Sequence, residues 1–564
     1  MNNTRTIAYF CMEIGHRPEM PTYAGGLGVL AGDTLRSAAD LRLPMVAVSL
    51  LHRKGYFRQI LDRNGGQQEA AVKWALEDFV KETPARTSVV LEGRTVHVRA
   101  WTFPLRGTGD HPIPVYLLDT NLEENSEWDR SLSDFLYGGD AHFRLCQEVV
   151  LGLAGVRVLR QLGYRSIERF HMNEGHAALL GVELLQERLR EVPGDAVPGD
   201  AIEAVKKLCV FTTHTPVPAG HDVFPGEQAR RILEPRVVTV LERLGCLDGS
   251  LNMTHLALKL SHAVNAVSQR HAEVSRKLLG TDRVEGITNG VHAPTWVGPK
   301  LAQLYDRYLS GWRADAFVLR EALKIPKHEL WSAHVHAKLH LLDYVSRTTG
   351  VVMDRDVFTI GFARRAAAYK RAALLFDSIE RVRRLHKSIG PIQIVYAGKA
   401  HPSDQGAKEI IRSVHHAMET LRGEIAVCYL ADYDMTTCAL MTAGVDVWLN
   451  TPKPPLEASG TSGMKAAMNG VPSLSVLDGW WVEGCIENVT GWGLGAEDGD
   501  GDISTGRAQT AAALYDKLEY IILPMFYHER DRYVDVMRHA IAINGPHFST
   551  RRMVLQYATR MYYS

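Results

Sequence analysis

Several features that would place a protein at once are scarce or missing in this sequence. Its 564 residues contain 7 cysteines, and no two of them have the close spacing of a zinc site. Sparse, scattered cysteines are typical of reduced and mostly buried thiols. We therefore expect a cytoplasmic protein with no bound metal.

Long apolar runs and an excess of one charge are also missing. No apolar stretch is long enough to span a bilayer, and the first residues show no secretory signal. Lys plus Arg equals Asp plus Glu, 64 against 64, so no overall field attracts nucleic acid or an anionic membrane. We expect neither as a partner. The chain is long enough for two or more domains.

Short apolar segments alternate with helical ones in the second half. Helices are predicted over 372–387 and 405–422. Such alternation indicates a parallel sheet covered on both faces, which is a doubly wound α/β fold. The predicted strands of this half are 357–362, 392–397, 425–430, 446–450 and 473–477.

The first half repeats this rhythm less regularly. Two β-rich arms around Glu92 and Gly93 predict a hairpin over 89–99, inserted in the domain. We therefore predict an α/β protein of two Rossmann-like, doubly wound domains that face a cleft. The predicted strands of this half are 7–10, 45–50, 115–118, 169–172 and 208–212.

Four parts of the chain are predicted. Residues 1–300 form an N-terminal Rossmann-like domain with the hairpin insertion, and 301–355 form a helical connection. Residues 356–525 form a C-terminal Rossmann-like domain. Residues 526–564 form a helical tail, and its course back onto the N-terminal domain is left open.

A glycine-rich segment follows the first predicted strand. Gly25, Gly26 and Gly28 open a predicted helix that runs to Ala39. Glycines let a ligand approach the backbone, and free N–H groups at a helix start attract anions. A tight turn without a ligand explains the segment equally well, so both interpretations stay open.

A second small-residue segment, 457–465, leads into a helix that carries Lys465. The residues from Ser459 to Gly463 can cradle an anion, although the Gly-Lys-Ser/Thr ending of an ATP-type phosphate loop is absent. A lysine among small and apolar neighbours favours the neutral amine that forms Schiff bases. On these residues alone, however, an ordinary lysine that reaches solvent is the stronger interpretation.

Four cations lie within eight residues at the end of a central strand: Arg364, Arg365, Lys370 and Arg371. Guanidinium forks and a lysine together suit a phosphate dianion. The alternative is a solvated basic helix start, but positive charge there opposes the helix dipole. The segment therefore favours an anion site.

Histidines follow two strands of the first half. His176 and His214 lie near the carboxyl ends of predicted strands, without the spacing of a zinc protease. A single histidine at a strand end is more often structural than catalytic. Two of them facing one cleft favour a role in it.

Taken together, these residues resemble the α-glucan phosphorylase family of glycogen, starch and maltodextrin phosphorylases. The resemblance spans roughly 7–300 and 357–488, and the segment 457–465 is its most specific part. It implies that Lys465 carries pyridoxal 5'-phosphate as a Schiff base. It places at this cofactor Thr461, Ser462, Gly463, Tyr433 and Gly26.

The resemblance also implies the substrate contacts. Arg365 and Lys370 would bind the substrate phosphate, with Arg364 standing where many members carry Lys. Asn173-Glu-Gly-His176 departs from the Asn-Asp-Thr-His of larger members, and the role of Glu174 is left open. The implied sugar contacts are His214, Glu457, Asn289, Gly25, Gly26 and His176.

The function implied is reversible phosphorolysis of terminal α-1,4-glucosidic bonds with retention, which releases glucose 1-phosphate. The partners are an α-1,4-glucan or maltooligosaccharide and inorganic phosphate, and a homo-oligomer is left open. The first strand lies close to Met1, so we expect no N-terminal regulatory extension. Residues 136–140 resemble a shortened gate loop.

Two other functions are compatible with this architecture. A retaining sugar-nucleotide glycosyltransferase places a second Glu eight positions after the first, and here that position is Lys465. A non-catalytic glucan-binding protein has no need of Lys465, Arg365, Lys370 and His214. Both are therefore less favoured than a phosphorylase.

Overall fold

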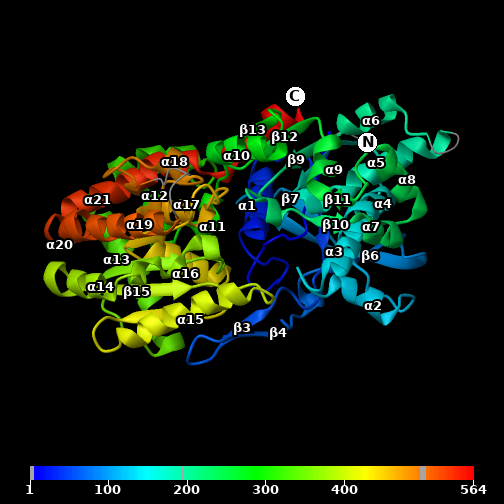
Figure 1. Ribbon diagram of the computed structural model, residues 1–564. Helices are drawn as coiled ribbons and strands as arrows, with labels where there is room; N and C mark the ends of the chain where they lie inside the picture. Colours follow the sequence, from blue (N-terminus) through cyan, green and yellow to red (C-terminus); the bar gives the residue numbers. More distant parts are fainter. Residues whose placement is uncertain (1–4, 193–195, 496–502, 564) are drawn as a thin grey trace.

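A computed structural model describes residues 5–192, 196–495 and 503–563 (Figure 1). Each half of the chain builds its own parallel sheet with helices around it. Figure 1 shows the two halves side by side, the blue-to-green half next to the half that contains the yellow and orange helices. The predicted α/β class with two Rossmann-like units is confirmed.

The first sheet has nine strands in the order β13-β12-β9-β8-β1-β2-β7-β6-β5. The strands from β13 to β7 are parallel, and β6 and β5 add antiparallel to the edge. All five predicted strands are present. The bounds in sheet order are Val284–Gly286, Ala263–Ala266, Cys209–Thr212, Ile167–Asn173, Thr6–Phe10, Met45–Leu50, Pro112–Asp119, Arg94–Arg106 and Lys81–Leu91.

The predicted hairpin is formed by β5 and β6. Leu91 pairs with Arg94, and Glu92 and Gly93 between them both have positive φ, 50° and 77°, as a two-residue hairpin turn requires. Its strands extend the first sheet, because β6 pairs with β7 from Arg99 to Arg106. The sequence pattern did not indicate that the hairpin continues the main sheet.

The second sheet has six parallel strands in the order β16-β15-β14-β17-β18-β19. The chain starts in the centre at β14, moves outward to β16 and then returns to β17 on the other side. A doubly wound sheet binds ligands at this reversal, outside the carboxyl ends of its central strands. The bounds in sheet order are Val427–Leu430, Ile392–Ala397, Phe358–Ala363, Val447–Asn450, Ser473–Val476 and Gly491–Leu494.

One predicted helix is wrong as a single element. Residues 372–387 form a 3-10 turn at Ala372–Phe376, the helix α14 at Ile379–Arg384 and a π-helical segment at Leu385–Ile389. Ser378 interrupts the run because its side chain accepts the Arg381 N–H and starts a new helix. The other predicted helix is confirmed as α15, Gln405–Thr420.

The chain crosses between the halves at two adjacent segments. Val291 and Ser549 lie in a parallel bridge, with the Val291 N–H 2.9 Å from the Phe548 carbonyl. A Cβ at Gly290 would lie 2.3 Å from the Ser549 carbonyl carbon, so glycine is required there. The final helix α23, Thr550–Tyr557, then packs on α1, Gly26–Asp40, of the first half. How these crossings divide the chain into domains stays a prediction.

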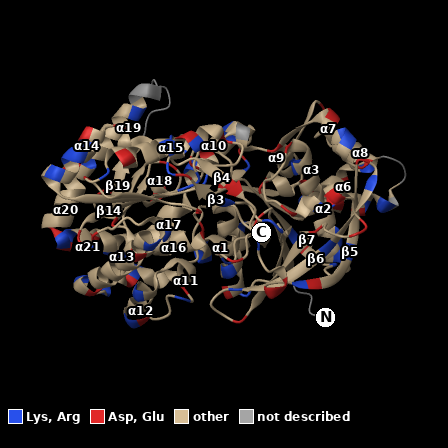
Figure 2. Ribbon diagram, turned by 90° about the horizontal axis from the view of Figure 1, so that it is seen from below, with Lys and Arg blue, Asp and Glu red and all other residues tan. Residues whose placement is uncertain are grey.

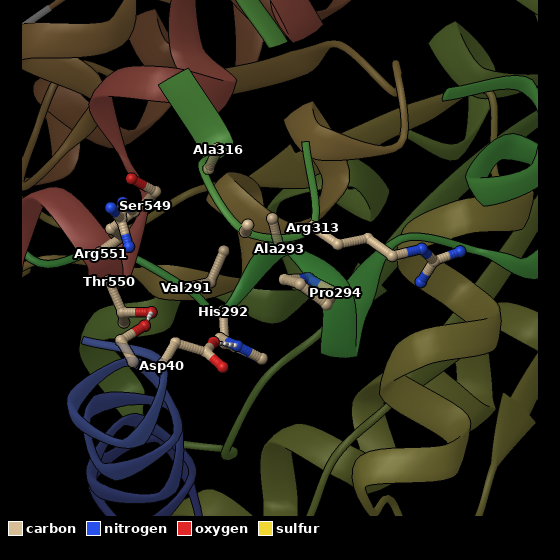
Figure 3. A pocket seen from close by; sticks show the side chains of 12 residues that line it. Asp40, Val291, His292, Ala293, Pro294, Arg313, Ala316, Ser549, Thr550 and Arg551 are labelled. Atoms are coloured by element: carbon tan, nitrogen blue, oxygen red, sulfur yellow. Dashed lines mark hydrogen bonds and ion pairs between the residues drawn. The ribbon is translucent and has the colours of Figure 1, made fainter. Parts of the chain in front are cut away.

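A small cavity lies beside these crossings (Figure 3). Its volume is about 10 Å³, which is about the space of one water molecule. His292 points to Asp40 there, with Nε2 2.9 Å from Oδ2, while Ser549 and Thr550 line another side. This junction is packed structure and has no room for a sugar.

A two-stranded arm joins the halves elsewhere. We define the arm as β3, Arg58–Leu61, and β4, Gln67–Ala70, which leave the first half and lie beside α15 (Figure 1). The Gln59 and Gln67 amides donate to the carbonyls of Gly398 and Ala400, each over 2.9 Å. Both glutamines are buried, so the arm fixes one edge of the second sheet to the first half.

Charges of both signs are interspersed over both halves in Figure 2, in line with their equal numbers. None of the described helices is long and apolar enough to cross a membrane.

Candidate active site

The basic segment follows β14, the strand at the reversal of the second sheet. Arg364 and Lys370 are both buried and converge on one carboxylate: their side-chain nitrogens lie 2.5 and 2.6 Å from Oε2 of Glu457. Arg365 points to solvent instead. The segment does not begin an α-helix, since two short 3-10 turns, Ala368–Lys370 and Ala372–Phe376, follow. The helix-dipole argument for an anion site was therefore wrong, although the cations do converge.

Glu457 is ionised in this setting. Burial raises its pKa, but the charges of Arg364 and Lys370 outweigh burial and hold the pKa at about 2. Asp478 holds the backbone of Glu457 by accepting its N–H at 2.8 Å. Burial, together with the charge of Glu457, raises the pKa of Asp478 to about 6.

Lys465 is buried in α17, Thr461–Met468, with 4% of its surface exposed. Its Nζ lies 3.6 Å from the centre of the Trp296 ring and 3.6 Å from Sγ of Cys438. Within the described ranges no carboxylate forms an ion pair with it. The solvent-reaching interpretation is therefore wrong for Lys465. A buried amine held by a thiol and an aromatic ring suits a covalent bond to an aldehyde.

The start of α17 presents donors rather than a side-chain cap. Gly460 precedes it with φ of +90°, and a Cβ at Gly463 would lie 2.6 Å from the Trp480 ring, so Trp480 packs directly on the first turn. Ser462 Oγ accepts the Trp448 indole N–H at 3.2 Å. Tyr433 lies beside Cys438. Burial raises the pKa of Tyr433, and the neighbouring thiol raises it further.

Three buried polar atoms around this helix start have no hydrogen-bond partner among the described residues: Arg364 Nη1, Ser459 Oγ and Trp480 Nε1. All three can donate, and buried donors are rarely left unpaired in a native protein. Donors of this kind suit a phosphate group, whose oxygens accept hydrogen bonds. Together with Lys465, this donor set fits pyridoxal 5'-phosphate.

His214 lies in the first half, after β9. Its Nε2 is 2.8 Å from Oδ1 of Asn173, and its backbone N–H donates to Glu174. Burial lowers the pKa of His214 to about 3, so the ring is neutral. His176 is fully buried, and its Nε2 accepts the Met12 N–H at 2.9 Å. This contact gives His176 a structural partner, and its substrate role stays a prediction.

The glycine-rich loop starts α1 and faces the second half. A Cβ at Gly25 or Gly26 would meet nothing within 4 Å, so the fold itself does not require glycine there and a ligand can approach. Gly28 differs, since a Cβ would lie 2.5 Å from Oε2 of Glu13. The Tyr23 hydroxyl accepts the Met435 N–H of the second half at 3.2 Å.

The two halves also meet next to Glu457. Ser268 of the first half donates to the carbonyl of Ala458 at 2.7 Å. Asn289, near this contact in the chain crossing, has a buried Oδ1 without a hydrogen-bond partner in the described structure. Thr288 beside it donates to Glu483 of the second half at 2.7 Å.

Sequence reasoning missed three residues of this site: Trp296, Cys438 and Asp478. Trp296 and Cys438 are distant in sequence from Lys465, and no local pattern connects them. Asp478 carried a usable signal, because it lies two residues after the end of β18 and so at the carboxyl edge of a parallel sheet.

The fold defines a class: two Rossmann-like units, each with helices around its own parallel sheet, the architecture of a two-domain glycosyl-transferring enzyme. A sequence profile of the carbohydrate phosphorylase family matches residues 245–498. Maltodextrin phosphorylase of Thermococcus litoralis is 37% identical over 99% of this chain and 70% of its own length. The chain belongs to this carbohydrate phosphorylase family.

Two glycogen phosphorylases give the same result. That of Mycobacterium tuberculosis is 36% identical over 99% of this chain and 70% of its own length. That of Aquifex aeolicus is 35% identical over 99% of this chain and 86% of its own length.

Proposed function

We propose that this protein is an α-glucan phosphorylase that releases glucose 1-phosphate from the ends of α-1,4-glucans or maltooligosaccharides. The observation that carries the proposal is the pair of buried cations, Arg364 and Lys370, held by the single carboxylate of Glu457. Two buried cations against one anion leave an excess positive charge, and a phosphate dianion offsets it. The names of the relatives support the same activity.

Pyridoxal 5'-phosphate is proposed as the cofactor, held by Lys465 with Thr461, Ser462 and Gly463 at its phosphate. When bound, it supplies a second phosphate that exchanges a proton with the substrate phosphate. A phosphate has its second pKa near ~6, so near neutral pH it can both give and take a proton.

In the proposed reaction the C1–O bond of the terminal glucose breaks and a bond from C1 to a phosphate oxygen forms on the same face. The proton of the substrate phosphate goes to the departing glucan oxygen. Lys370 and Arg364 hold the phosphate and offset its charge, which is the electrostatic contribution of this site. Arg365 is exposed beside them and stays a predicted phosphate contact. A phosphate that engages Arg364 and Lys370 frees Glu457 to accept hydrogen bonds from sugar hydroxyls.

His214 is proposed to contact the same sugar from the first half. With Nε2–H donated to Asn173, the neutral ring keeps Nδ1 as an acceptor for a sugar hydroxyl. Asn289 is proposed as a further sugar contact, because its buried Oδ1 needs a donor. Gly25 and Gly26 leave room for the glucan on the other side.

The test is glucose 1-phosphate release from maltoheptaose, with bound cofactor quantified on the same sample. We expect product that depends on inorganic phosphate and about one pyridoxal phosphate per chain, since one lysine carries it. Cofactor without product would contradict the substrate assignment. Neither cofactor nor product would contradict the proposal as a whole. A cytoplasmic location and a homo-oligomeric state remain predictions.

A further inference from the structure

The backbone is strained at one residue of the first half's site. Glu174, which directly follows β8, has φ +86° and ψ 162°. This region of φ and ψ is occupied almost only by glycine, and a side chain there costs about 1–3 kcal/mol. Such strain persists only where the surroundings hold it, and it gathers at functional sites.

The carboxylate of Glu174 explains what holds it. Oε2 accepts the His214 N–H at 2.7 Å and the Thr215 hydroxyl at 3.0 Å, and Oε1 accepts the Gly175 N–H at 2.9 Å. Three donors meet one acceptor-only group, so a carboxylate fits better than an amide. The strained backbone turns this side chain toward the loop after β9, while its own N–H donates to the Thr212 carbonyl at 2.9 Å.

Asn173 and Glu174 therefore hydrogen-bond to His214 at two points. Asn173 Oδ1 holds the ring through Nε2 at 2.8 Å, and Glu174 holds the backbone. The Asn173 amide is itself oriented, because its Nδ2 donates to Sγ of Cys11 at 3.2 Å. Because the ring and the backbone of His214 are both fixed, its Nδ1 is held in one orientation.

We propose that Glu174 is a positioning residue: its carboxylate, at a strained backbone, fixes His214 and Thr215 so that His214 contacts the glucosyl unit next to the bond that is cleaved. This inference rests on the proposed function, because that function makes His214 a sugar contact. Glu174 acts through His214, and its side-chain hydrogen bonds are all to residues of the first half, whereas the cations that hold phosphate belong to the second. The sugar side of the reaction should therefore depend on it, and the phosphate side should not.

The test compares Glu174→Ala, Glu174→Gly and Glu174→Gln in the holoenzyme, with maltoheptaose phosphorolysis and Tm as the two readouts. Glycine relieves the strain that alanine keeps, so Glu174→Gly should have a higher Tm than Glu174→Ala. Both should show the same fall in kcat of about 10- to 100-fold, as a misplaced contact group causes, with the KM for phosphate unchanged. Glu174→Gln keeps one acceptor oxygen, so its kcat should lie between that of these two variants and that of the wild type.

Glu183→Gln is the matched control. Glu183 is also buried, on α5, Leu179–Arg188, and pairs with Arg157 at 2.7 Å, away from His214. This variant should lower Tm without lowering kcat in the remaining folded enzyme.

Wild-type kcat in Glu174→Gly would overturn the proposal, because the carboxylate would then not be needed to position His214. A fall in kcat that follows Tm through all four variants would also overturn it, as would an equal rise in the KM for phosphate. A wild-type enzyme that forms no glucose 1-phosphate would overturn the proposed function itself.

Discussion

Glu457→Gln removes the carboxylate that faces both Arg364 and Lys370 while keeping nearly the same shape. The pKa of Glu457 is about 2 in the folded protein against an ordinary value of 4.5. A difference of about 2.5 pKa units corresponds to roughly 3 kcal/mol of stabilisation of the folded state. Breaking a buried ion pair by removing one partner costs a similar amount, about 3–5 kcal/mol.

The sign of the pH dependence follows from the lowered pKa. The contribution of Glu457 is fully present above about pH 4.5 and is lost as the pH falls toward 2. At pH 7 the variant should therefore show a Tm roughly 2–3 °C lower than the wild type, as this loss implies for a chain of 564 residues. Acidification from pH 4.5 should destabilise the wild type more than the variant.

Inorganic phosphate supplies a second readout for the same change. In Glu457→Gln the two cations lose their internal anion, so phosphate should bind more tightly and raise Tm more than it does in the wild type. The control is Glu424→Gln in the same half, whose carboxylate also faces two cations, Arg383 and Lys387, at 2.8 and 3.3 Å but is 34% exposed. Its loss should lower Tm much less, because exposed ion pairs contribute little to stability. An unchanged Tm in Glu457→Gln, together with a phosphate response equal to that of the wild type, would refute this reasoning.

Four further changes test other parts of the site and the fold. Lys465→Ala should abolish retention of pyridoxal phosphate after desalting, measured by absorbance, and one cofactor per chain in that variant would exclude Lys465 as its attachment point. Lys370→Ala should raise the KM for phosphate and leave the KM for maltoheptaose almost unchanged, and an unaltered dependence on phosphate would remove Lys370 from the anion site. Asp478→Asn should flatten the dependence of Tm on pH between about 4 and 6. The pKa of Asp478 is about 6 in the folded protein against an ordinary value of 3.8, so its protonated form stabilises the fold by about 3 kcal/mol below pH 3.8, and this stabilisation is lost as the pH rises. A curve parallel to that of the wild type would contradict this reasoning. Gln59→Ala removes the hydrogen bonds of this side chain to the Gly398 carbonyl and the Asp432 N–H. The free energy of unfolding, measured by chemical denaturation, should fall by about 1–3 kcal/mol. An unshifted denaturation midpoint would show that the arm does not hold the two halves together.

The sheets could be predicted from the sequence because their strands are buried on both faces. In β14, β15 and β2 every residue is buried, and such strands read as short apolar runs between helices. The helix predicted over 372–387 failed for a local reason, since Ser378 competes for the backbone N–H groups that a continuous helix would use. Apolar periodicity does not register such a cap.

The residues of the candidate site could also be predicted only in part. Lys370 was predicted from its unusually basic segment at the end of a strand, whereas Lys465 and Glu457 were assigned through the resemblance of their segment to the phosphorylase family. Trp296 was not predicted, because its place against Lys465 depends on how the two halves pack. Glu174 was noticed only as a departure, and its positive φ is a property of the fold that no residue type announces.

One measurement tests the central claim most directly: transfer onto maltoheptaose from glucose 1-phosphate, compared with transfer from uridine diphosphate glucose on the same sample. The account predicts chain extension with release of inorganic phosphate from glucose 1-phosphate, and no extension from the sugar nucleotide. Extension from the sugar nucleotide alone would contradict it, and the buried cations would then serve a diphosphate donor.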